Sequence, residues 1–288
     1  MISRFLTALG LFSATVAAPG LPQSLPTGAV PQASVPAATP GALSYADVAD
    51  LVLGSPVILD ATVRSASRIK GAEATNVAPG RTRFYIEADV TALIRGAGGV
   101  PPRIGYVVDL PPGPDGRLPK LKKMRVLAFA RSGAAASGQL QLSAPDGQQP
   151  WSAPLDATVR AVAAEAVSAE TPPRITGVGN AFHVPGSLPG EGETQIFLST
   201  ADNRPVSLSV LTRPGEQRRW AVALSEVVDE AAAPPRPNSL LWYRLACGLP
   251  QSLPARSTAE LAPDDASAAQ DDYRFVRSSL GPCRRTRS

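Results

Sequence analysis

The only histidine in the chain, His183, is the first residue to consider as a catalyst. It lies in the segment Phe182–Glu193, which is dense in glycine and proline. A histidine beside a serine or a carboxylate can act as a general base in hydrolysis. However, the chain has no Gly-x-Ser-x-Gly segment, the turn that exposes the nucleophile of α/β-hydrolases. A hydrogen-bonding role at a turn is therefore the main interpretation of His183, and catalysis in a hydrolase is the alternative.

The acidic side chains do not have the spacing of a metal site. Glu191 and Glu193 share a glycine-rich loop, and four aspartates surround the expected C-terminal helix, namely Asp264, Asp265, Asp271 and Asp272. A calcium loop needs oxygen ligands spaced around an essential turn, and neither group fits. The two cysteines alone cannot complete a zinc site. We expect solvated carboxylates and no bound metal.

Glu87 and Asp89 lie on one face of an expected strand, where they resemble the paired acids of glycosidases. Ion pairs across the sheet are the favoured interpretation, because opposite charges on neighbouring strands stabilise each other. The arginines in reach are Arg64, Arg81 and Arg83.

No nucleotide or nucleic-acid signature is present. Gly177-Val178-Gly179 lacks the third glycine and the following helix of a dinucleotide loop, so no cofactor is expected. A basic run, Lys120–Arg125, accompanies a formal net charge of +4. For an exported chain, this charge favours solubility or attraction to anionic envelope surfaces over nucleic acid.

The N-terminus predicts export. Arg4 precedes the uncharged apolar run Phe5–Ala18, so residues 1–18 have the pattern of a secretory signal peptide. A membrane-anchoring helix is the alternative, but the run is shorter than the ~20 residues that span a bilayer. No membrane span is therefore expected in the mature chain. Residues 19–43, rich in proline and alanine, predict a disordered linker. The expected location is the periplasm or the secreted fraction.

An exported chain can oxidise its two cysteines, Cys247 and Cys283. We predict a disulfide between the end of one helix and the residues just past the C-terminal helix, ahead of the short basic tail Arg284, Arg285 and Arg287. Two free thiols remain the alternative.

Residues 44–150 predict a short helix or strand lead-in and then a five-stranded OB-like β-barrel. The strand signals are 56–64, 81–94, 104–110, 124–130 and 139–143. Tyr85 and Tyr106 are candidates for a ligand-binding face. Three segments, Ala49-Asp50-Leu51, Leu93-Ile94-Arg95-Gly96 and Val126–Phe129, resemble the netrin and metalloproteinase-inhibitor type of OB barrel over 45–145. That resemblance implies a fold and not protease inhibition, because the inhibitors chelate zinc through an N-terminal cysteine that is absent here.

Residues 151–288 predict an α+β domain. Residues 155–169 have a helical apolar face, and 175–184, 195–200, 205–212 and 219–227 predict an antiparallel meander. Helices are expected over 240–249 and from Pro263 to Leu280. The stretches Gly177–Thr194 and Leu241–Cys247 resemble uncharacterised exported proteins of sphingomonad-like alphaproteobacteria, a family that implies no site residues.

These patterns favour a non-enzymatic envelope protein that binds a partner, either an envelope protein or a glycan. A hydrolase that uses His183 is the second hypothesis, and inhibition of an exported protease, which rests on the barrel resemblance alone, is the third.

Overall fold

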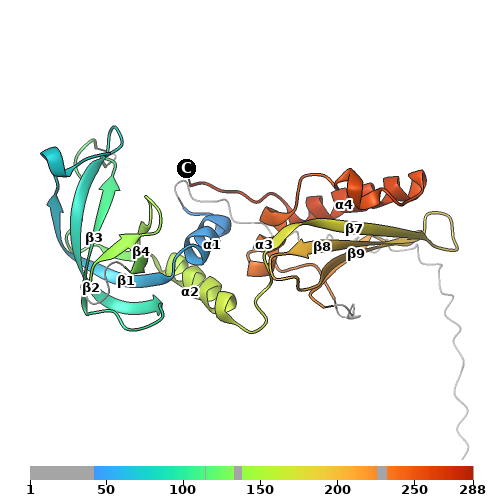
Figure 1. The fold of residues 1–288 in the computed structure, drawn as a ribbon, viewed down its shortest axis with the longest axis horizontal. Helices are drawn as coiled ribbons and strands as arrows, with labels where there is room; N and C mark the ends of the chain where they lie inside the picture. Colours follow the sequence, from blue (N-terminus) through green and yellow to red (C-terminus); the bar gives the residue numbers. More distant parts are fainter. Residues whose placement is uncertain (1–41, 114, 133–137, 226–231, 288) are drawn as a thin grey trace, which may run out of the picture. The chain divides into compact units, whose positions relative to one another are not determined.

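The computed structural model describes residues 42–113, 115–132, 138–225 and 232–287 (Figure 1). The predicted signal peptide, 1–18, and all but the last two residues of the predicted linker, 19–43, lie outside these ranges. Thr39–Ser288 form one compact unit. The predicted mixed α+β fold with antiparallel sheets is confirmed.

The first sheet joins its strands in the order β3-β2-β1-β4-β5, and β6 also pairs with β4. All named pairings are antiparallel. The pairing of β1 with β2 has three register irregularities. Irregularities of this kind interrupt the regular pleat and favour strong curvature of the sheet. The strands are β1 (Val57–Arg68), β2 (Thr82–Arg95), β3 (Arg103–Leu110), β4 (Arg125–Ser132), β5 (Leu140–Leu142) and β6 (Gln148–Pro150). A short 3-10 helix, η1 (Gly71–Glu73), follows β1.

Alternation along the strands sends one set of side chains into a core on one face of this sheet. Phe84, Ile86 and Ala88 of β2 are buried there, as their spacing predicts. Tyr106 is also buried, with 1% of its surface exposed, and its hydroxyl donates to Gln148 Oε1 at 2.7 Å. The expectation that Tyr106 helps to form a ligand face is therefore wrong, because its ring is part of the core.

The opposite face of β1 and β4 packs against helices. Helix α1 (Tyr45–Leu53) begins at a capping box, in which Ser44 and Asp47 satisfy each other's backbone N–H groups. Helix α2 (Ala153–Val167) lies along α1 and buries Val159 and Val162 against it. The proposed domain boundary at 150/151 remains a prediction, although α2 packs on an element from the preceding half.

The second sheet has the order β10-β9-β8-β7 and is antiparallel throughout, as predicted. Helix α4 covers one of its faces, and α3 and the 3-10 helix η2 contact β7 (Figure 1). Val206, Leu208 and Val210 of β9 point into this core. The elements are β7 (Ile175–Pro185), β8 (Gly192–Thr200), β9 (Val206–Thr212), β10 (Arg219–Ala223), α3 (Leu240–Gly248), η2 (Ala255–Thr258) and α4 (Pro263–Leu280).

Candidate functional site

His183 lies near the end of β7, where its side chain points to the α4 side of the sheet. Its Nδ1 atom is 2.8 Å from the hydroxyl of Thr194, the residue opposite it on β8. Thr194 in turn donates its single hydroxyl proton to Asp272 Oδ2 at 2.5 Å. The threonine oxygen must therefore accept from His183, so Nδ1 carries a proton. The neutral imidazole then has its lone pair on Nε2.

Asp272 closes this hydrogen-bonded series from helix α4. Its side chain is 6% exposed, and Arg218 pairs with Oδ1 at 3.2 Å. These two partners offset the cost of burying the charge of the carboxylate and hold it in one position. The expectation that Asp272 is a solvated carboxylate is therefore wrong: it faces the sheet from the inner side of α4.

His183 and Asp272 line a small cavity of about 210 Å³ at the end of the β7–β8 hairpin. Gly192 provides the space for the imidazole, because a Cβ atom there would lie 2.8 Å from His183 Cε1. Glu191, which also lines the cavity, accepts hydrogen bonds from the backbone N–H groups of Ser187 and Leu188. That carboxylate therefore fixes the hairpin turn.

This arrangement has the parts of a positioned general base. The buried acid acts through a hydroxyl to hold one tautomer of the imidazole, as the acid of a catalytic triad does directly. Thr194 itself is fully buried and bound to Asp272, so it is a positioning residue and not a nucleophile. A water molecule at Nε2 is the nucleophile that this geometry can activate.

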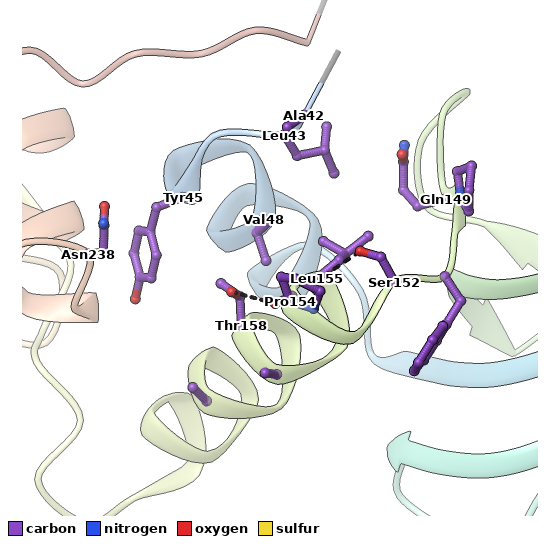
Figure 2. A pocket seen from close by; sticks show the side chains of 14 residues that line it. Ala42, Leu43, Tyr45, Val48, Gln149, Ser152, Pro154, Leu155, Thr158 and Asn238 are labelled. Carbon is purple, nitrogen blue, oxygen red and sulfur yellow. Dashed lines mark hydrogen bonds between the residues drawn. The ribbon is translucent and has the colours of Figure 1, made fainter. Parts of the chain in front are cut away.

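A larger groove lies between α1 and α2 and has a volume of about 680 Å³ (Figure 2). Val48 of α1 and Leu155 of α2 meet in it, and Gln149 of β6 lies at one side (Figure 2). The lining is mainly apolar, with a few polar side chains at the edges. It consists of Ala42, Leu43, Tyr45, Val48, Gln149, Pro150, Trp151, Ser152, Pro154, Leu155, Ala157, Thr158, Ala161 and Asn238.

Contacts with neighbouring side chains fix the two aromatic residues of the groove, Trp151 and Tyr45. Arg125 stacks on the ring of Trp151, with its guanidinium carbon 3.9 Å from the ring centre. The same guanidinium binds Asp60 through two hydrogen bonds, of 2.9 and 2.6 Å, and the Asp60 side chain is 1% exposed. At the other end, Tyr45 packs edge-to-face on Trp242 at 6.0 Å. A groove with fixed walls loses little entropy when a ligand binds.

The residues after α4 form a second polar feature, which we call the C-terminal clasp: Arg284–Arg287 bound to Asp47, Asp50 and Asp146. Asp47 accepts from the backbone N–H of Thr286 at 3.0 Å and from its hydroxyl at 2.6 Å. Arg287 forms two hydrogen bonds with Asp146, of 2.6 and 2.7 Å. Arg285 pairs with Asp50 at 2.6 Å. The basic tail thus joins the last residues described to the first helix.

Asp47 is fully buried, and burial alone would raise the pKa of its carboxyl group. Hydrogen bonds from Thr286 and Ser44 outweigh that effect and lower the pKa to about 2. For Asp146, the hydrogen bonds from Arg287 lower the pKa as well. Both carboxylates are therefore charged throughout the neutral range and hold the clasp.

The predicted disulfide between Cys247 and Cys283 is confirmed. Cys247 is in the last turn of α3, and Cys283 lies three residues past the end of α4. Clasp residue Arg284 follows directly, and its carbonyl accepts from the hydroxyl of Ser44 at 2.7 Å. The bond therefore fixes both the helix pair and the starting point of the clasp.

The other predicted candidates have structural partners. Asp89 pairs with Arg64 and Arg103, and Glu87 accepts from the hydroxyl of Ser65 at 2.6 Å. The hydroxyl of Tyr85 bonds to the side-chain amide of Gln139. Glu87, Asp89 and Tyr85 thus each bind a neighbouring side chain on the outer surface of the first sheet.

Within the described ranges, no group of three or more His, Cys, Asp or Glu side chains has the arrangement of a metal site. In the same part of the chain, no helix combines the length and apolar character needed to cross a membrane. Comparison of the sequence with protein-family models and with curated proteins finds no match.

Proposed function

We propose that the chain is an exported envelope protein that binds an extended apolar segment of a partner protein in the groove between α1 and α2. The observation that carries this proposal is the groove itself. Its volume lies within the range of natural ligand sites, its lining is apolar, and a few polar side chains at its edges can fix an orientation. The disulfide supports the oxidising location.

The proposal includes an OB-like barrel for residues 44–150 as the scaffold of the groove. Support comes from the two end strands of the first sheet. A parallel bridge joins Gly105 of β3 to Gln139, next to β5, and Gly105 N donates to Gly138 O at 2.9 Å. Gly105 permits this approach, since a Cβ atom there would lie 2.9 Å from the amide of Gln139. Contact between the end strands is what closure of a curved sheet requires.

Filling the groove tests the proposal. Ala161 is exposed on α2 and lines the groove, so Ala161→Trp blocks it without entering the core. Peptides selected from a phage-displayed random library on the exported chain should lose at least about tenfold in affinity for this variant, because a bulky ring takes the place of the ligand.

Ala164→Trp is the matched control, because Ala164 is exposed on the same helix but is absent from the groove lining. Equal melting temperatures of both variants show that the fold is intact. Selected peptides that bind Ala161→Trp as well as they bind the original chain contradict the proposed site.

A hydrolase is the second candidate, and the series Asp272–Thr194–His183 specifically favours it. We expect any hydrolysis of ester, glycan or peptide substrates by the chain to fall at least about 100-fold in His183→Ala, since general-base catalysis contributes that much. Asp272→Asn should also lower the rate and shift its pH profile, whereas Asp264→Asn, which is exposed in the first turn of the same helix and does not line the cavity, should not. Activity that survives His183→Ala excludes this mechanism.

A further inference from the structure

All four lysines of the chain lie in two loops: Lys70 in the β1–β2 loop, and Lys120, Lys122 and Lys123 in the β3–β4 loop. Strands β1 and β3 are both antiparallel to β2, so they run in the same direction. The loops that follow them therefore leave the sheet at the same end. We call these lysines, together with Leu118, the basic end.

Contacts fix both loops to this end of the sheet. Lys123 N donates to Val63 O of β1 at 2.7 Å, and Ile69 N donates to Arg83 O of β2 at 2.9 Å. Leu121 is 3% exposed and belongs to the core of the first sheet, so it anchors the β3–β4 loop. The flanking Lys120 and Lys122 are exposed.

The charge at the basic end is not balanced. Loops 69–81 and 111–124 carry six cationic side chains and two acidic ones. Among the described residues, no carboxylate pairs with any of the four lysines. In contrast, loop 96–102 between β2 and β3, at the opposite end, has no charged side chain. Concentrated charge of one sign on one end attracts a surface of the other sign.

An apolar side chain accompanies these cations. Leu118 lies two residues before Lys120 and is 45% exposed. A polyanionic polysaccharide would use the lysines alone, whereas a lipid surface offers both anionic headgroups and an acyl boundary for a leucine. We infer that the basic end binds the surface of an anionic phospholipid bilayer, with the lysines at the headgroups and Leu118 at the acyl boundary.

Vesicle binding by the purified exported chain tests this inference. Sedimentation with phosphatidylcholine vesicles that contain phosphatidylglycerol should recover the protein at low salt, and vesicles of phosphatidylcholine alone should not. Each lysine near an anionic surface contributes about fivefold, so Lys120→Gln/Lys122→Gln/Lys123→Gln should weaken partitioning roughly 100-fold. Raising the salt concentration should also weaken the partitioning of the original chain onto anionic vesicles, because salt screens the charges.

The matched control is Arg213→Gln/Arg236→Gln/Arg256→Gln, which removes the same charge from exposed sites in the second half and should leave binding within about twofold. Leu118→Ser should weaken binding to vesicles and leave any binding to immobilised polygalacturonate unchanged. The inference is overturned if anionic vesicles fail to bind the folded chain, if the lysine and arginine variants behave alike, or if only the polysaccharide is bound.

Discussion

Replacing Cys247 and Cys283 together by alanine is expected to lower the free energy of unfolding by about 3–4 kcal/mol. The bond joins residues 36 apart, so its loss restores much conformational freedom to the unfolded chain. A local effect should accompany the global one. Because the clasp begins at the residue after Cys283, backbone amides of Thr286 and Arg287 should exchange faster with solvent. Urea titration and hydrogen exchange measure the two effects.

The reduced original chain is the control for this variant, since it lacks the bond but keeps the sulfur atoms. Its unfolding midpoint should match that of the double variant. A loss below about 1 kcal/mol in both would contradict the assigned role of the disulfide, as would unchanged exchange at the clasp.

The Asp47→Asn substitution is expected to cost about 3 kcal/mol, because it removes a buried charge that several donors share. An amide cannot accept from Thr286, Arg287 and Ser44 as a carboxylate does, and its own N–H group would face these donors. Asp50→Asn is the control on the same helix. The Asp50 side chain is 28% exposed, so we expect a smaller loss, of about 1 kcal/mol. Equal losses in urea titrations would show that burial at Asp47 does not matter.

The same carboxylate sets an acid limit on stability. Its pKa is about 2 in the folded chain against an ordinary value of 3.8, so the unfolded state takes up a proton first as the pH falls. Its stabilising contribution is complete above about pH 4 and is lost between about pH 4 and 2. Asp47→Asn should therefore flatten this part of the stability profile, as measured by urea titration at a series of pH values.

The sequence predicted the regular elements well because their side chains repeat with the period of the structure. β2 was expected over 81–94 and is Thr82–Arg95, and the C-terminal helix has the expected bounds. β6 was missed, because Gln148-Gln149-Pro150 is too short and too polar to show alternation. Its pairing with β4 depends on residues that lie twenty or more positions away.

The candidate sites were less predictable because they depend on distant residues. His183 was identified from its type, but the sequence did not connect it with Thr194 or with Asp272, which was expected to be a solvated carboxylate. Asp272 lies 78 residues beyond Thr194, and only the packing of α4 on the second sheet brings them together. The available signal was helical position: Asp272 adjoins Tyr273, which lies on the apolar face of the helix. No sequence pattern predicted the groove, since it is a space that forms only when α1 and α2 pack together.

The clasp also determines when the first helix can reach its final state. Asp47 and Thr286 are 239 residues apart, so the contact that secures α1 has a very large separation along the chain. During synthesis from the N-terminus, α1 emerges early, but its buried carboxylate has only Ser44 as a partner until Thr286 and Arg287 have been made. Such long-range contacts form late in folding and leave the intermediate open to association. We therefore expect ribosome-bound chains that end before residue 284 to hold α1 only loosely.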